Sequence, residues 1–201
     1  MRKPGFLILV ITYSINCYCQ TNGDYFKKGM TEAKLKDYRG AILDFSKAIE
    51  LNPTDAMAYV DRGASKGYLH DYEGAIADYS KAIELNPKFA GAYFNRGLNK
   101  AKLQNYQGAI SDYGKAIEFN AKDETIYYNR GLSKEKLKDY TEAILDFSEA
   151  IELNPKYAEA YTDRGAAKIV LGQKDNGCID LKKALELGDS SASDMIKMAC
   201  E

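Results

Sequence analysis

The polar residues best suited to chemistry recur in one short motif, which reads AYVDRG at 58–63, AYFNRG at 92–97, IYYNRG at 126–131 and AYTDRG at 160–165. Each copy places an asparagine or aspartate before an arginine, and a glycine follows. An asparagine offers both a donor and an acceptor, and an arginine can hold a carboxylate through two parallel N–H bonds. Because the motif is repeated, it favours packing or binding contacts over a single catalytic centre.

Residues for other kinds of chemistry are scarce. His70 is the only histidine, and no metal cluster, Ser-His-Asp set or glycine-rich phosphate loop can be assembled from the sequence. We therefore expect a protein that is not an enzyme and that needs no cofactor and no metal. An enzyme would need a fused catalytic domain, for which the repeats described below leave no residues.

The overall charge of the chain is nearly balanced. Its 201 residues include 28 Lys and Arg against 29 Asp and Glu, which gives a formal net charge of −1. Such a chain has no bulk attraction for nucleic acid or for an anionic membrane surface. With 45% hydrophobic and 28% charged residues, its composition is typical of a folded globular protein.

The N-terminal residues 1–19 resemble a signal peptide. Arg2 and Lys3 precede an apolar run at 6–11, which weakens over the next few residues. The apolar core is roughly 10 residues long, whereas a membrane-spanning helix needs about 20. We expect an exported protein, periplasmic or secreted, with no membrane span after cleavage.

The two cysteines of this segment leave two ways to process it. Cys17 and Cys19 stand at the small −3 and −1 positions of a cleavage site, so that the mature chain would begin at Gln20. The alternative is lipidation of one cysteine, which would anchor the protein to a membrane. Asn16 and Tyr18 argue against lipidation, because a small residue usually precedes the acylated cysteine.

A period of 34 residues organises the rest of the chain. Tyrosines recur at 25, 59, 93, 127 and 161, and five units follow without insertions: 22–55, 56–89, 90–123, 124–157 and 158–191. In each unit the apolar residues fall at helical spacing in two blocks, which predicts a pair of helices. Asn-Pro at 52–53, 86–87 and 154–155 ends the second helix, and Asp37, Asp71, Asn105 and Asp139 are expected to cap its start.

These units resemble the tetratricopeptide repeat family. Unit two matches the family pattern at Tyr59, Gly63, Tyr72, Ala75, Tyr79, Ala82 and Pro87. The resemblance implies an all-α, right-handed superhelical solenoid of five helix-turn-helix repeats. Unit five is degenerate, with Gly177, Leu181 and Asp189 at three pattern positions, and residues 192–201 are expected to form a final capping helix.

Most of the tyrosines have a packing explanation. Eleven of the 16 fall at repeat positions 4, 17 or 24, where the family pattern has aromatic rings between helices. A stacking platform for a sugar or a nucleic acid is the alternative. Their helical spacing favours core packing.

The resemblance also implies a binding groove. In the family, position 6 of each first helix faces a concave groove that takes extended peptides. The expected groove residues are Asp61, Asn95, Asn129 and Asp163, with Phe94, Tyr128, Lys102 and Lys136 around them. The alternative is that these polar side chains are simply solvated.

When neighbouring helices pack antiparallel, certain residues of the two helices lie at the same height. Two further contacts can be predicted from this. Cys178 of unit five lies level with Cys200 of the final helix, so we expect a disulfide, with two buried thiols as the alternative. The same rule predicts ion pairs between consecutive repeats: Asp44 with Arg62, Asp78 with Arg96, Asp112 with Arg130 and Asp146 with Arg164. Lys28 replaces the arginine in unit one, which has no predecessor. Contact with a ligand is the alternative role for the arginines.

The sequence thus favours a non-catalytic scaffold that binds a protein or peptide segment in the groove. The alternative is an envelope component, anchored through a lipidated or uncleaved N terminus, whose repeats pack against other envelope proteins. No nucleic acid partner is expected.

Overall fold

Residues 21–200 are described by the computed structural model, and within them the chain forms eleven α-helices and no strand. The helices are α1 (Asn22–Lys34), α2 (Tyr38–Leu51), α3 (Ala56–Tyr68), α4 (Tyr72–Leu85), α5 (Ala90–Lys102), α6 (Tyr106–Phe119), α7 (Glu124–Lys136), α8 (Tyr140–Leu153), α9 (Ala158–Val170), α10 (Lys174–Glu186) and α11 (Ala192–Ala199). The predicted signal peptide at 1–19 and its cleavage site lie outside the described residues. No helix among the described residues is long and apolar enough to cross a membrane.

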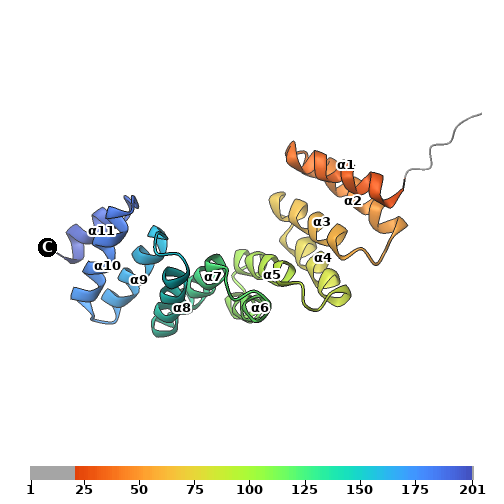
Figure 1. The fold of residues 1–201 in the computed structure, drawn as a ribbon. Helices are drawn as coiled ribbons and strands as arrows, with labels where there is room; N and C mark the ends of the chain where they lie inside the picture. Colours follow the sequence, from red (N-terminus) through yellow and green to blue (C-terminus); the bar gives the residue numbers. More distant parts are fainter. Residues whose placement is uncertain (1–20, 201) are drawn as a thin grey trace, which may run out of the picture.

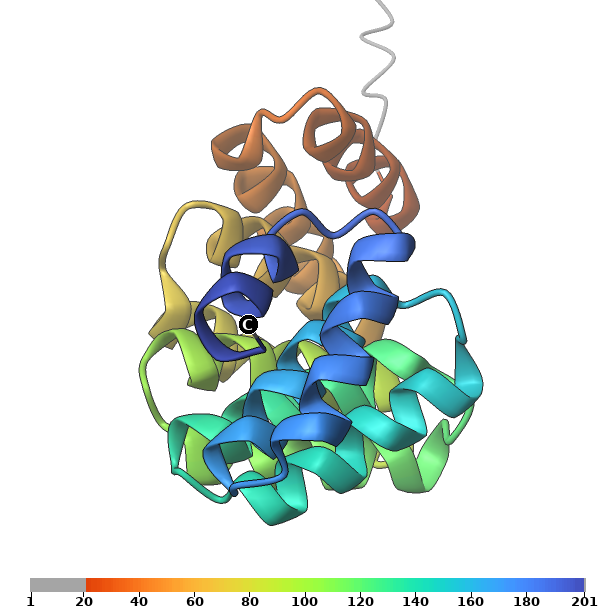
Figure 2. The ribbon, with the colours of Figure 1, turned by 90° about the vertical axis from the view of Figure 1, so that its left-hand side faces the viewer.

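The helices form an α-solenoid that follows a curved path (Figure 1). Each helix packs against the next one in sequence, and the first helices of neighbouring repeats (α1, α3, α5, α7 and α9) also contact one another. The second helices make no such contacts with each other, so the first helices lie on the inner, concave side of the curve. Figure 2, viewed from the end that carries α11, shows the pairs receding behind one another.

The inner turn of each repeat is built as the sequence predicts. Asp37, Asp71, Asn105 and Asp139 cap the second helices, because each side chain accepts a hydrogen bond from the backbone N–H three residues later. One residue before each cap the backbone has a positive φ, at Lys36, His70, Gln104 and Lys138. A left-handed residue ends the first helix and directs the chain into the second.

The core lies between the two helices of each repeat and extends to the following helix, as where Ala92 packs in one cluster with Tyr79. Gly97 of the AYFNRG motif faces the ring of Tyr113, and a Cβ at Gly97 would lie 2.7 Å from Tyr113 Cε1. Position 8 is therefore glycine because the ring of position 24 lies against the helix backbone. The rings and side chain at position 24 are buried in all five repeats, at Phe45, Tyr79, Tyr113, Phe147 and Leu181.

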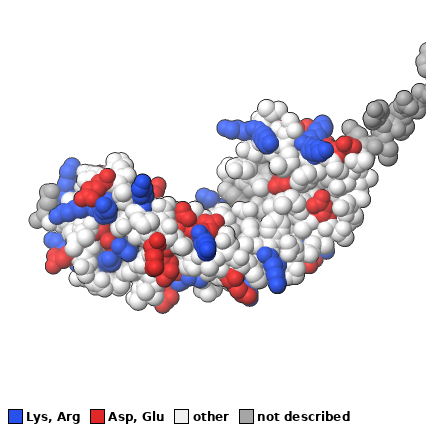
Figure 3. Space-filling view, in the orientation of Figure 1, with Lys and Arg blue, Asp and Glu red and all other residues white. Residues whose placement is uncertain are grey.

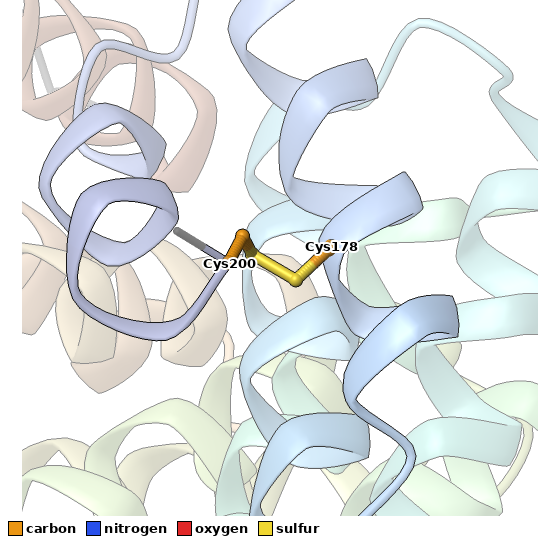
Figure 4. The surroundings of a disulfide bond; sticks show 2 residues. All are labelled: Cys178 and Cys200. Carbon is orange, nitrogen blue, oxygen red and sulfur yellow. A yellow bond between two sulfur atoms is a disulfide. The ribbon is translucent and has the colours of Figure 1, made fainter.

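The C-terminal helix α11 covers the last repeat. Ala192 is buried against Leu181 and Ala184 of α10. The predicted disulfide is present, since Cys178 on α10 bonds to Cys200 just after α11, with 5.8 Å between the Cα atoms (Figure 4). The apolar face of the last repeat is therefore covered, as the end of a solenoid requires.

Candidate functional site

The arginines of the repeated motif pair with aspartates of their own repeat. Arg96 donates to both carboxylate oxygens of Asp112, with Nε–Oδ2 at 2.9 Å and Nη2–Oδ1 at 2.7 Å. The equivalent pairs are Arg62 with Asp78, Arg130 with Asp146 and Arg164 with Asp180. Only 4% of the Asp112 side chain is exposed. These are therefore partly buried, two-bond ion pairs that hold the first helix to the second.

The prediction that these pairs join consecutive repeats is wrong. Asp44, Asp78, Asp112 and Asp146 do not bind Arg62, Arg96, Arg130 and Arg164 of the following repeat; from Asp78 onward, each aspartate binds the arginine of its own repeat. The second helix packs antiparallel against its own first helix as well as against the next one. Antiparallel packing therefore places two arginines at the same height as each aspartate, one in its own repeat and one in the next. The direction of the aspartate side chain selects the arginine of its own repeat.

A lysine completes each of these clusters. Lys100 lies 2.8 Å from Asp112 Oδ2, so that one carboxylate holds two cations. Lys66, Lys134 and Lys168 do the same in their repeats, where the last aspartate is Asp180. These lysines and Asp180 were missed by sequence reasoning, although the lysine recurs every 34 residues and could have been found by that spacing.

The arginines nevertheless link neighbouring repeats through a serine. Arg96 Nη1 donates to Ser80 Oγ of the preceding repeat at 3.0 Å. The bonds from Arg62 to Ser46 and from Arg164 to Ser148 are equivalent, at 3.1 Å. For Arg130 the preceding repeat has Gly114 at this position, and no side chain is there to accept the bond. The guanidinium groups are thus committed to the scaffold, and these contacts do not support the alternative of a ligand contact.

The candidate binding site is a row of cavities along the concave side. We name each cavity by the two repeats that form it: the repeat-1/2 pocket (about 270 Å³), the repeat-2/3 pocket (about 380 Å³) and the repeat-3/4 pocket (about 280 Å³). Equivalent residues line all three. In the repeat-2/3 pocket these are Ala64, Tyr68, Tyr72, Tyr79 and Asn95, among others. The 34-residue period of the sequence thus becomes a repeated pocket.

Five of the eight predicted groove residues lie in these pockets. Asp61 lines the repeat-1/2 pocket, Asn95 the repeat-2/3 pocket and Asn129 the repeat-3/4 pocket. Lys102 lines the second and third pockets, and Lys136 lines the third. Each of the three pockets therefore combines apolar walls with a polar side chain at position 6.

The other three predicted residues make contacts within the protein. Phe94 packs against the core ring of Tyr113, with centroids 5.9 Å apart. Tyr128 donates a hydrogen bond of 2.7 Å to Asp163, which engages both side chains with each other. The residues at position 5 therefore contribute to packing beside the groove. The bond between Tyr128 and Asp163 also makes the junction of repeats four and five different from the earlier junctions.

The tyrosines at position 17 were missed as pocket residues. Tyr38, Tyr72 and Tyr106 each line a pocket and are partly exposed, whereas the sequence assigned them to the core. Core packing is confirmed for Tyr79 and Tyr113 at position 24, which are 2% and 1% exposed. Helical spacing could not separate the tyrosines at position 17 from those at position 24, because both groups face the inside of a helix pair. Only the curvature of the solenoid leaves the position-17 rings exposed to a pocket.

Burial changes the acidity of Asp61 in the repeat-1/2 pocket and of two carboxylates on α7 and α9. Burial, together with the charge of Asp55, raises the pKa of Asp61 to about 6. Burial likewise raises the pKa of Asp163, although the bond from Tyr128 opposes the shift. Burial and the charge of Asp163 raise the pKa of Glu135. A ligand at these places would meet acids that bind protons more readily than free carboxylates do.

The asparagines keep groups available for a ligand. One N–H of Asn129 bonds to the carbonyl of Thr125 at 2.7 Å, which leaves its oxygen and second N–H. The Asn95 side chain makes no hydrogen bond with residues 21–200 of the chain. Because an amide can donate and accept, such groups can hold a peptide backbone whatever its side chains are.

Charge on the visible face is mixed, with lysine and arginine side chains interspersed among aspartates and glutamates (Figure 3). Residues 21–200 contain no cluster of three His, Cys, Asp or Glu that could hold a metal ion.

Comparisons with known proteins agree with this architecture. Family models described as "Tetratricopeptide repeat" match residues 25–55 and 125–157, and a model described as "TPR repeat" matches 69–104 and 100–138. A search of curated protein sequences finds no match.

Solved structures share the fold over most of the chain. A crystal structure of MamA is 25% identical with a TM-score of 0.77, and the match covers 82% of this chain and 96% of that one. MamA 41-end from Desulfovibrio magneticus RS-1 is 18% identical with a TM-score of 0.79, covering 84% and 97%. YrrB, described as a TPR protein with an unusual peptide-binding site, is 20% identical with a TM-score of 0.77, covering 87% and 91%.

Proposed function

We propose that this chain, which belongs to the tetratricopeptide repeat family, is a non-catalytic scaffold that binds an extended protein segment in its concave groove. The observation that carries the proposal is the row of three equivalent pockets. Each could accept an apolar side chain while the position-6 side chain holds the backbone beside it. YrrB, which shares the fold, is described as having a peptide-binding site, and this supports the binding of a peptide by this chain.

The test removes the amides that would hold the backbone. Asn95→Ala combined with Asn129→Ala should abolish the capture of partner proteins by the immobilised chain, since both pockets lose their backbone contact. Asn176→Ala is the matched control, because Asn176 is exposed on α10, away from the three pockets. Circular dichroism verifies that each variant is folded. Capture that is undiminished in the double variant, while both proteins are folded, would refute groove binding through these residues.

We also propose that the protein is exported. The Cys178–Cys200 disulfide supports this, because such bonds persist in oxidising compartments and are rare in the cytosol. The measurement is the mass of the mature protein isolated from its native host. A chain that begins at Gln20 without lipid supports a freely diffusing binder, whereas an added acyl mass supports the anchored envelope component. A full-length chain with free cysteine thiols would contradict export.

A further inference from the structure

The repeat-2/3 and repeat-3/4 pockets share one wall, which α5 provides. Leu98 and Lys102 line both the repeat-2/3 pocket and the repeat-3/4 pocket. A segment that filled both pockets would have to cross the ridge that these two residues form. The group of the segment that crosses this ridge would lie beside the ammonium of Lys102.

The charge at this ridge is uncompensated. The residues that line the repeat-2/3 and repeat-3/4 pockets include no aspartate or glutamate. Among residues 21–200, no carboxylate lies within 4.0 Å of Lys102 Nζ. Lys100, two residues earlier on the same helix, is instead paired with Asp112 at 2.8 Å. Lys102 is therefore an exposed cation that faces the groove, whereas its neighbour belongs to the scaffold.

Carboxylates stand at both ends of this cationic stretch. Asp61 occupies the repeat-1/2 pocket, at the position held by Asn95 and Asn129 in the next two pockets. Beyond the third pocket, burial raises the pKa values of Asp163 and Glu135, and the charge of the nearby Lys136 offsets only part of this rise. The repeat-2/3 and repeat-3/4 pockets thus carry lysines without a carboxylate, whereas the charge on either side is mixed, because Lys34 shares the repeat-1/2 pocket with Asp61.

We infer that the middle of the groove recognises a segment that carries an acidic side chain between two apolar side chains. This inference rests on the proposed function and specifies its ligand. The apolar side chains fill the repeat-2/3 and repeat-3/4 pockets, and the carboxylate between them meets Lys102. Asn95 and Asn129 hold the backbone on either side. The repeat-1/2 pocket, which is lined by both Asp61 and Lys34, adds no charge preference of its own.

The probe is a set of fluorescent peptides that are acetylated and amidated, so that they have no terminal charge. Each has two phenylalanines or leucines, at a series of spacings, around a central Glu, Gln or Lys. Anisotropy titration of the full chain gives Kd. At low salt we expect the Glu peptide to bind about three- to fivefold more tightly than the Gln peptide, and the Lys peptide to bind most weakly. The preference should shrink as salt is added.

Two variants assign the preference to the ridge. Lys102→Gln should remove the advantage of Glu over Gln, and Lys102→Glu should reverse it in favour of the Lys peptide. Lys122→Gln, in the exposed turn between α6 and α7, changes the net charge equally and should keep the preference. Equal binding of the Glu and Gln peptides, or a preference that survives Lys102→Gln, would overturn the inference.

The failures of the two proposals can be told apart. Peptides that bind, lose binding in the Asn95→Ala, Asn129→Ala variant and show no charge preference would overturn the acidic ligand alone. Absence of binding by every peptide in the set would overturn both. A Gln peptide with a free C-terminal carboxylate that binds better than the amidated Glu peptide would show that a chain end, and not a side chain, meets Lys102.

Discussion

The first repeat and the repeats after it hold the same aspartate in different ways. In the third repeat Asp112 binds Arg96 and Lys100, and Arg96 also reaches Ser80 of the repeat before it. In the first repeat Asp44 is paired with Lys28 alone at 2.9 Å, and no earlier repeat is present in the described chain. The comparison indicates that an arginine is needed where one side chain must bond both to the aspartate of its own repeat and to the serine of the preceding repeat. A lysine lacks the planar fork of donors that this requires.

The two clusters also differ in exposure and in charge balance. The Lys28 side chain is 59% exposed, whereas that of Arg96 is 18% exposed. Beside Asp44 lies Glu32, at the position that Lys100 has in the third repeat, and burial together with the charge of Asp44 raises the pKa of Glu32. The cluster of the third repeat is therefore a desolvated site with two cations, while that of the first repeat has two largely buried acids that share one exposed lysine.

The largest expected effect comes from removing the aspartate in each place. Asp112→Asn leaves Arg96 and Lys100 partly buried without a carboxylate, and we expect a loss of about 3 kcal/mol in the free energy of unfolding. Asp44→Asn should cost less than about 1 kcal/mol, because Lys28 can turn to solvent. Urea titration followed by circular dichroism measures both. Equal losses would show that the two clusters contribute alike and that the comparison is unfounded.

The sequence specifies the helix pairs more fully than it specifies their contacts. The inner-turn caps such as Asp71 could be predicted because a cap depends only on neighbouring residues of the sequence. The Cys178–Cys200 bond could be predicted because it joins two consecutive helices that pack antiparallel. The partner of Arg96 could not, since aspartates of two neighbouring helices lie level with it. The identity of Tyr72 as a pocket residue required the curvature of the whole solenoid, which no single repeat encodes.

A glycine offers a way to sharpen the comparison between repeats. Gly114 in α6 stands where Ser46, Ser80 and Ser148 accept a bond from the next repeat, and a Cβ added there would meet nothing within 4 Å. Gly114→Ser should raise the free energy of unfolding by about 1 to 1.5 kcal/mol, from better helix propensity and a new bond with Arg130.

The control for this gain is Gly114→Ala, which improves the propensity without supplying a hydroxyl. Because alanine is the better helix former, the bond is measured by how far the serine variant loses stability relative to the alanine variant when Arg130 is also changed to Lys, which removes the planar fork. Urea titrations of the four proteins give the coupling. A difference between the serine and alanine variants that is the same with and without Arg130→Lys would mean that the inter-repeat bond contributes nothing measurable.

The smallest expected effect concerns position 6, where Asp61 in the repeat-1/2 pocket replaces the asparagine of the next pocket. Burial raises the pKa of Asp61 to about 6, whereas the unfolded chain has the ordinary value of about 3.9. Between these values the folded chain binds more protons, so the wild type loses stability as the pH rises from about 4 to 6. Above pH 6 the full cost of ionising a half-buried carboxylate is present.

Asp61→Asn should therefore stabilise the protein at pH 7.5, by no more than about 1 kcal/mol, because the side chain is still partly screened by solvent. The gain should fade as the pH falls to 4, where the carboxyl group is protonated in the folded state and needs no relief. Asn95→Asp is the reciprocal variant and should introduce a cost of the same sign in the repeat-2/3 pocket. A difference in the free energy of unfolding between wild type and Asp61→Asn that stays constant from pH 4 to 7.5 would show that the pKa of Asp61 is the same in the folded and unfolded chain. Burial in the repeat-1/2 pocket would then have no effect on this carboxyl group.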